Sequence, residues 1–300
     1  MLGWLKRGGN TQGWLAVSID EAGLAHAHAR RVHGAKPRVI SYAADRPRRE
    51  LAASGQCSTV LGAGEYDMLM VEAPNVPRGE MKSALRWKVK DLVDYPIVEA
   101  TVDFLDIPAE PGAAAGRSHQ VYAVLARNAL IQARVAQFEN AGVGLQAIEI
   151  PETAQRNIAA LYEEAGRGAA LAYFGRDWGL LTITHAGELY LSRRLDVGVD
   201  ALAGDPDGEE GGPLERVALE IQRTLDHFER QFRHVAVGKL LLAPTGRPTR
   251  LPEILRARFE MPVEQVDLAE VLFFSGRAPD GATQWRLFHH FGAALREGTA

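Results

Sequence analysis

The sequence predicts an α/β protein made of two related lobes, because one strand pattern occurs twice. In each copy three short strands are joined by tight turns, and the copies begin about 150 residues apart. The first copy comprises 14–20, 24–30 and 36–42, and the second comprises 169–174, 178–185 and 189–195. Helix-rich stretches follow both copies. A duplicated unit of this kind predicts two lobes that face one cleft, and in such folds the cleft usually holds ATP.

Helices and strands alternate between the two copies. Apolar runs and alternating patterns predict strands at 66–72, 99–107, 119–126 and 145–149, the first of them a buried strand. Periodic apolar positions and end signals predict helices at 47–54, 80–93, 127–141 and 152–164. Pro and Gly give 108–117 the composition of a loop.

After the second copy, the sequence predicts one long helix over 214–232. Its apolar side chains have the spacing of a buried stripe: Leu214, Val217, Ala218, Ile221, Leu225, Phe228 and Phe232. Shorter elements complete the chain, namely strands at 237–242 and 263–266 and helices at 252–259 and 285–296.

The composition favours a globular protein without a strong charge. At 300 residues, with a formal net charge of −4, the chain has no basic field, so nucleic acid is not an expected partner. Cys57 is the single cysteine, which excludes an internal disulfide and fits a reducing compartment. No run of about 18 uncharged apolar residues occurs, so no helix is expected to span a bilayer. We expect a cytoplasmic protein.

Residues 80–106 resemble a known family. A helix carrying 84–87 (ALRW) is followed by 94–97 (DYPI) and by an acidic-flanked strand that ends at 102–104 (VDF). This order resembles the PilM-like proteins of type IV pilus assembly, most closely the MSHA-pilus biogenesis proteins of the MshI type. The cytoplasmic part of the type II secretion protein GspL is a more distant relative. The final segment 291–296 (FGAALR) also resembles the last helix of the family.

The resemblance implies an actin-like fold with two RNase H-like lobes, 1–150 and 151–300, and a small inserted subdomain at about 78–126. It follows the order of elements over nearly the whole chain but is specific only within 80–106. The duplicated strand pattern agrees with it independently.

The residues at the cleft depart from those of actin-like ATPases, which need anionic metal ligands and unblocked backbone donors. The first Asp position falls on Ser18, and a shift of two residues would place Asp20 there beside Glu21. The second falls on Tyr173, before Gly175, so that carboxylate is absent. The glycine pair that admits adenosine is reduced to Gly246. We therefore expect no catalysis and no cofactor. ATP binding in this cleft is the alternative, and packing of these residues in a vestigial cleft is the simplest interpretation.

The helix predicted at 80–93 has two faces. Met81, Ala84, Leu85, Val89 and Leu92 form the expected buried stripe. Trp87 lies outside it, with Ser83 and Lys90 one turn away on either side, and Asp94 and Tyr95 follow. The resemblance implies a groove between the insert and the first lobe that holds the short cytoplasmic tail of a membrane partner. Partner-binding residues would then be Ser83, Trp87, Lys90, Asp94 and Tyr95. Coverage of Trp87 by the strand at 99–107 is the alternative.

The leading hypothesis is a non-catalytic cytoplasmic scaffold of a type IV, MSHA-type pilus machine. It would bind the N-terminal tail of a bitopic, PilN-like inner-membrane protein and reach the membrane only through that partner. The family further implies a link to the secretion ATPase. The alternatives are an ATP-binding actin-like switch and, third, a sugar-kinase-like enzyme, which the missing cleft carboxylates disfavour. No metal site is predicted, because His26 and His28 share a strand face without a third ligand.

Overall fold

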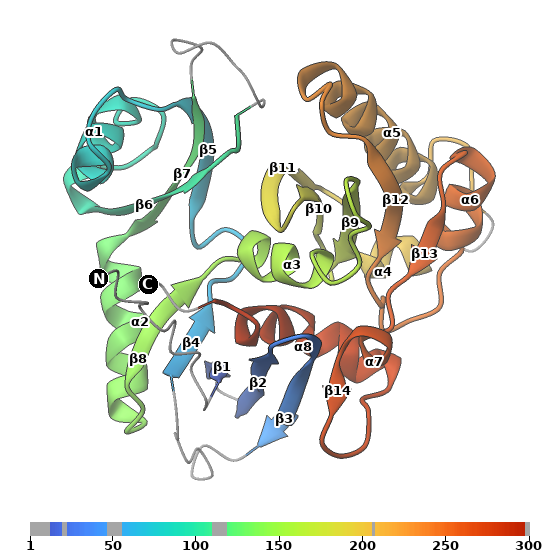
Figure 1. Ribbon diagram of the computed structural model, residues 1–300, viewed down its shortest axis with the longest axis horizontal. Coiled ribbons are helices and arrows are strands. Elements are labelled where there is room, and N and C mark those ends of the chain that lie inside the picture. The colour runs from blue at the N-terminus through green and yellow to red at the C-terminus, as the bar shows by residue number, and fades with distance from the viewer. Residues whose placement is uncertain (1–12, 20–22, 47–55, 110–118, 206–207, 298–300) are drawn as a thin grey trace, which may run out of the picture.

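The computed structural model describes residues 13–19, 23–46, 56–109, 119–205 and 208–297. Asp20 and the helix predicted at 47–54 lie outside the described residues, as does most of the loop predicted at 108–117. The described part of the chain forms two large sheets and one small sheet, with helices between and around them (Figure 1).

The first large sheet has the strand order β14-β3-β2-β1-β4-β8. Strands β1, β2 and β3 form an antiparallel meander, whereas β4 runs parallel to β1 and β8 runs parallel to β4. The strands span Trp14–Ile19 (β1), Leu24–Val32 (β2), Ala35–Arg46 (β3), Gln56–Val60 (β4), Leu145–Glu149 (β8) and Phe273–Phe274 (β14).

The second large sheet repeats this plan, with the order β11-β10-β9-β12-β13. Its first three strands again form an antiparallel meander, and β12 and β13 again run parallel to the first strand. The strands span Gly168–Phe174 (β9), Gly179–His185 (β10), Glu188–Leu195 (β11), Val237–Leu242 (β12) and Val263–Gln265 (β13). The repeat predicted from the sequence is therefore confirmed as two lobes of one topology.

Two helices lie between the lobes, α3 (Pro151–Ala159) and α8 (Gly281–Ala294) (Figure 1). They share one apolar core with the facing sides of both large sheets, where Ala16, Ala27 and Ala29 leave room for α8. The two helices cross closely: a Cβ on Gly292 would lie 2.1 Å from the carbonyl oxygen of Ala154. Although α8 comes from the C-terminal half, it packs on β1 and β2, and β14 pairs with β3.

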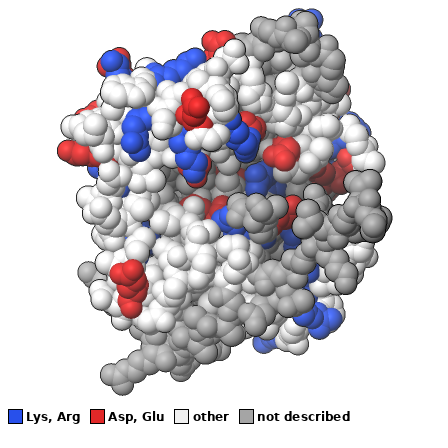
Figure 2. Space-filling model, turned by 60° about the vertical axis from the view of Figure 1, so that its left-hand side comes forward, with Lys and Arg blue, Asp and Glu red and all other residues white. Residues whose placement is uncertain are grey.

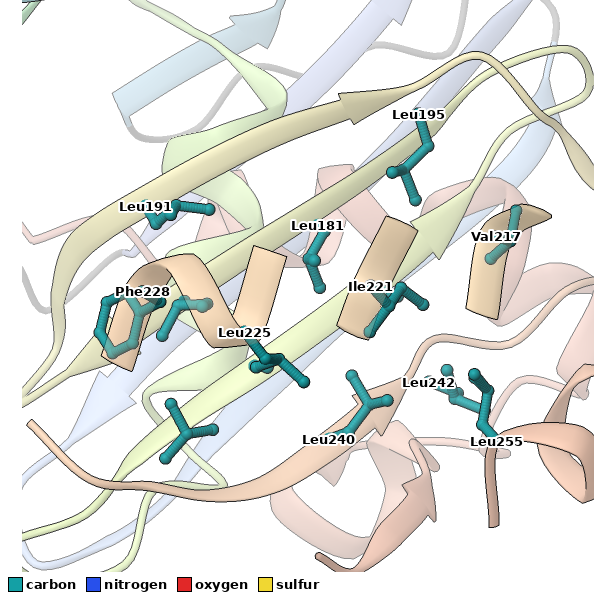
Figure 3. Packing of buried hydrophobic residues seen from close by; sticks show 14 of the residues in the cluster. Leu181, Leu191, Leu195, Val217, Ile221, Leu225, Phe228, Leu240, Leu242 and Leu255 are labelled. Carbon is teal, nitrogen blue, oxygen red and sulfur yellow. The ribbon is translucent and has the colours of Figure 1, made fainter. Parts of the chain in front are cut away.

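The outer face of the second sheet is covered by α4 (Val199–Ala203), α5 (Pro213–Gln231) and α6 (Leu251–Arg258). All seven apolar positions predicted for the long helix are buried, and Figure 3 shows four of them, Val217, Ile221, Leu225 and Phe228, packed among leucines of the sheet. On the first lobe, α2 (Asn128–Asn140) covers the outer face through Phe138. Helix α7 (Leu268–Val271) precedes β14.

The insert is a three-stranded antiparallel sheet, order β5-β7-β6, with α1 (Met81–Lys88) against one face. Its strands are Asp67–Glu72 (β5), Ala100–Asp106 (β6) and Gln120–Arg127 (β7), and two single 3₁₀ turns lie at Arg78–Glu80 and Ile97–Glu99. The predicted insert, 78–126, omits β5. The strand predicted as buried at 66–72 is thus a half-exposed edge strand of the insert, whereas the buried neighbour of β1 is β4, which the sequence pattern did not reveal.

Helix α1 is shorter than predicted and its apolar stripe is incomplete. It ends at Lys88, and of the predicted stripe Met81, Leu85 and Val89 are buried while Leu92 is 59% exposed. Leu92 lies beyond the helix end, so the helical period no longer decides which way its side chain points.

Candidate functional site

Helix α8 supplies two neighbouring histidines to the junction between the lobes. Nε2 of His290 lies 2.9 Å from Oγ of Ser18 on β1, whereas the ring of His289 lies 4.3 Å from the ring of Tyr173 on β9. Adjacent residues of a helix point about 100° apart, so one helix reaches both lobes. Ser18 and Tyr173, the two positions where carboxylates were missing in the sequence, both face α8.

Trp285 packs on Gly246, the glycine predicted to lie in a vestigial cleft. Its indole Nε1 donates a 2.7 Å hydrogen bond to the carbonyl oxygen of Phe174 at the end of β9. Its ring lies over Gly246, where an added Cβ would fall 2.5 Å from a ring carbon, and Gly246 has a φ of +67°. The retained glycine therefore accommodates a tryptophan of the same chain.

Gly175 accommodates a second tryptophan. A Cβ on Gly175 would lie 2.7 Å from Nε1 of Trp178, and the amide of Gly175 donates a 2.8 Å hydrogen bond to the carbonyl oxygen of Trp178. Trp178 is stacked with His289 at 6.1 Å, and Tyr173 is stacked with Phe288 at 5.4 Å. The sequence prediction missed these aromatic side chains, because nothing in the strand and turn patterns links residues 174–178 with 285–289.

The two histidines at the junction between the lobes are uncharged. Burial lowers the pKa of His289 to about 3 and that of His290 to about 4, so both imidazoles are uncharged near neutral pH. Nε2 of His289 and Nδ1 of His290 have no hydrogen-bond partner among the described residues. Burial also raises the pKa of Tyr173. Near neutral pH the two histidines of the junction therefore offer no positive charge to a phosphate group.

The five residues predicted to bind a partner lie on or after α1. Trp87 is 68% exposed, which excludes its coverage by β6, and Ser83, Lys90 and Asp94 are exposed as well. Tyr95 is buried instead: its hydroxyl donates to Asp67 at 3.1 Å, and Arg127 lies over its ring while pairing with Asp94. Ser83, Trp87 and Lys90 therefore form an exposed surface, whereas Tyr95 anchors the turn after α1.

A hollow of about 480 Å³ lies on the first lobe, between the end of β1, the segment that joins β4 to β5, and α2. It is lined by Ile19, Glu65, Leu130, Ala133, Arg134 and Gln137, none of which was predicted. Arg134 pairs with Glu65 at 2.8 Å, and Gln137 donates to the carbonyl oxygen of Ile19 at 2.9 Å. Figure 2 shows side chains of both charges on the upper part of this side of the molecule, where the insert lies, above a hollow near the centre.

The insert is joined to the second lobe by a buried polar contact. The hydroxyl of Tyr122 on β7 donates to the carbonyl oxygen of Tyr190 and accepts from the amide of Ser192, both at 3.2 Å. Nearby, the hydroxyl of Tyr66 donates to Glu152 at 2.5 Å, and burial raises the pKa of Glu152. The hydroxyl of Tyr122, a residue of the insert, thus satisfies two backbone groups at the edge of β11.

No protein-family model and no curated protein matches the chain. Among solved structures, it is similar to the PilM-PilN type IV pilus biogenesis complex, with 17% identity over 95% of this chain and 97% of that chain and a TM-score of 0.71. The fold is actin-like.

Two weaker similarities have TM-scores of 0.47. One is to a Bacteroides thetaiotaomicron protein with an actin-like ATPase fold, at 9% identity over 89% of this chain and 95% of that chain. The other is to the cytoplasmic domain of EpsL of the Vibrio cholerae type II secretion system, at 13% identity over 92% and 93%. The similarity at a TM-score of 0.71 confirms the predicted fold class.

Within the described residues, no helix is long and apolar enough to cross a membrane, and no group of three or more His, Cys, Asp or Glu side chains is arranged to hold a metal ion. His26 on β2 is buried, and its Nε2 lies 3.3 Å from Oγ of Ser41 on β3.

Proposed function

We propose that this protein is a non-catalytic scaffold of type IV pilus assembly, of the MSHA type, that binds the cytoplasmic N-terminal tail of a PilN-like inner-membrane protein. The supporting observation is the similarity to the PilM-PilN complex, which extends over 95% of the chain at a TM-score of 0.71. The scaffold would lie at the cytoplasmic face of the inner membrane, held there by its partner, and would link that partner to the secretion ATPase.

The lack of catalysis is proposed from what fills the interlobe junction. Trp285 lies on Gly246, Trp178 lies on Gly175, and the uncharged His290 contacts Ser18. Phosphoryl transfer depends on carboxylates that place Mg²⁺ and on open backbone donors for phosphate. Side chains of the same chain occupy those positions, which favours a rigid platform over a nucleotide-driven machine.

The hollow beside α2 is the proposed place for the partner tail. It is concave, it lies beside the segment that leads into the insert, and it combines the apolar Ile19 and Leu130 with the paired charges of Glu65 and Arg134. A short peptide gains affinity from such a site because apolar anchors and oriented polar groups act together. The exposed Trp87 surface on α1 is proposed as a second contact with the same partner.

The test is calorimetric titration of a synthetic peptide with the tail sequence of the cognate PilN-like protein. Ala133→Arg places a long charged side chain into the hollow from an exposed position, so the fold is expected to tolerate it. Gln132→Arg is the matched control, because Gln132 is exposed on the same helix and does not line the hollow. We expect Ala133→Arg to weaken binding at least tenfold and Gln132→Arg to leave it within twofold. Equal affinities of both variants would remove the hollow as the tail site.

A further inference from the structure

A second and larger hollow lies on the other side of the insert, where the insert approaches the second lobe. It has a volume of about 540 Å³, and its lining residues come mainly from β5, β11 and α5. Figure 1 shows where these three elements lie. We call it the basic groove. Its described lining consists of Met70, Leu191, Ser192, Arg193, Arg216, Leu219, Glu220, Arg223, Thr224, His227 and Gln231.

The basic groove carries uncompensated positive charge. Arg216 and Arg223 are exposed on α5, and neither forms an ion pair with any described residue, whereas Arg193 is paired with Glu220 at 3.0 Å. Arg223 follows Arg216 by seven positions, which places the two arginines about 10 Å apart along the helix axis. His227 continues the same stripe one turn further on.

Apolar side chains lie among these charges. Leu191 on β11 is buried, Leu219 on α5 is half-buried, and Met70 on β5 is 37% exposed. No Phe, Tyr or Trp is among the described residues that line the groove, so these residues supply no ring on which nucleic-acid bases could stack. The combination of free guanidinium groups with aliphatic surface suits a peptide that carries carboxylates and apolar side chains together.

Two parts of the molecule meet at the basic groove. Gln231 at the end of α5 donates to Oε1 of Gln120 on β7 at 3.3 Å and contacts Sδ of Met70 at 3.9 Å. Ser192 in the lining is also the residue whose amide donates to Tyr122 of the insert. A ligand in the groove would therefore touch the insert and the second lobe at once.

We propose that the basic groove binds an acidic, partly apolar segment of a partner protein in an extended conformation. Carboxylates of the segment pair with Arg216 and Arg223, and its apolar side chains cover Leu219 and Met70. The groove shares no lining residue with the hollow beside α2. Its occupation is therefore independent of the proposed tail binding, and either site can fail its test without the other.

The experiment uses the full chain and a fluorescein-labelled decapeptide in which Glu and Leu alternate, followed by fluorescence anisotropy at low salt. The test variant is Arg216→Glu combined with Arg223→Glu. The matched control combines Arg230→Glu with Arg233→Glu, which makes the same change in net charge at exposed positions outside the groove. A decapeptide with Gln in place of Glu tests the need for carboxylates, and circular dichroism confirms that all variants are folded.

We expect the test variant to raise the dissociation constant at least tenfold, the control to change it less than twofold, and the Gln peptide not to bind. Equal weakening in both variants would mean that only the net charge of the protein matters, and it would overturn the proposal. An unchanged affinity of the test variant would overturn it as well. Displacement of the peptide by tripolyphosphate at concentrations where free glutamate has no effect would assign the groove to phosphate instead. A benzophenone at the peptide end should cross-link to fragments containing Met70, and labelling confined to other fragments would also overturn the assignment.

Discussion

The indole Nε1 of Trp285 donates a 2.7 Å hydrogen bond to the carbonyl oxygen of Phe174. This bond ties the beginning of α8 to the end of β9, 111 residues earlier in the chain. Trp285 is half-buried against the core, and its indole N–H has a partner, a backbone carbonyl next to the glycine turn of the second lobe. The interlobe junction is thus a packed part of the core.

Gly246→Ala should destabilise the protein more than an ordinary glycine substitution. The φ of Gly246 is +67°, and a Cβ there would lie 2.5 Å from Trp285. Gly166→Ala is the control, because Gly166 has a φ of +76° with open space around it. We expect a loss of about 1 kcal/mol for the control and about 1–3 kcal/mol more for Gly246→Ala, by urea denaturation. Equal losses would show that Trp285 does not occupy this position.

His289→Phe should make the free energy of unfolding less dependent on pH. Burial holds the pKa of His289 at about 3, against 6.5 in an unfolded chain, so unfolding takes up a proton below pH 6.5. The free energy of unfolding then falls as the pH decreases from 6.5 toward 3, by up to about 1.4 kcal/mol per pH unit for this residue.

Phenylalanine cannot take up that proton, and its ring suits the contacts with Tyr173, Trp178 and Phe288. Urea denaturation at pH 7, 6, 5 and 4 should therefore show a smaller slope for the variant than for the wild type. Parallel curves would mean that His289 is accessible to protons in the folded state.

Trp87→Ala should weaken binding of the partner tail without weakening the fold. Trp87 is 68% exposed, so its removal should change the free energy of unfolding by less than about 0.5 kcal/mol. As a binding contact it should contribute about 1–2 kcal/mol to tail affinity. Phe273→Ala, which removes a ring that is 51% exposed at the edge of the first sheet, is the control and should leave affinity unchanged. An unaltered affinity for Trp87→Ala would remove α1 from the binding surface.

Tyr122→Phe should loosen the insert from the second lobe. It removes a hydroxyl that satisfies the carbonyl of Tyr190 and the amide of Ser192, and the loss should be about 1–3 kcal/mol because these groups are buried. Tyr42→Phe removes an exposed hydroxyl that bonds to the carbonyl of Arg277, and should cost less than about 1 kcal/mol. Thermal denaturation compares the two, and a larger loss for Tyr42→Phe would contradict the role of Tyr122.

The fold could be predicted where apolar spacing alone decides the structure. The two strand meanders and the stripe from Leu214 to Phe232 follow from periods of two and 3.6 residues, and each was found as predicted. Period did not assign the strand at 67–72, because a short apolar run fits a lobe strand and an insert strand equally well. It also failed at Leu92, where the helix had already ended.

The cleft could be predicted only as a loss of residues. Ser18 and Tyr173 indicated that carboxylates were missing, but they did not indicate which side chains occupy the space between the lobes. Trp285, His289 and His290 fill the space because α8 returns between the lobes, and that is a tertiary contact over more than 100 residues, with no local pattern to reveal it. The Trp87 surface was partly predictable. The exposure of Trp87 follows from the helical period, whereas the burial of Tyr95 depends on its hydrogen bond to Asp67, which no local pattern reveals.

The most direct test is the affinity of the tail peptide, measured with and without Mg-ATP. The nucleotide is added at about 1 mM, the upper end of the usual range of enzyme KM values. A scaffold whose interlobe junction is filled by its own side chains should give the same dissociation constant in both conditions, within twofold. A tenfold change with nucleotide, abolished by Asp20→Ala, would show that the space between the lobes still binds ATP and that the protein is a switch.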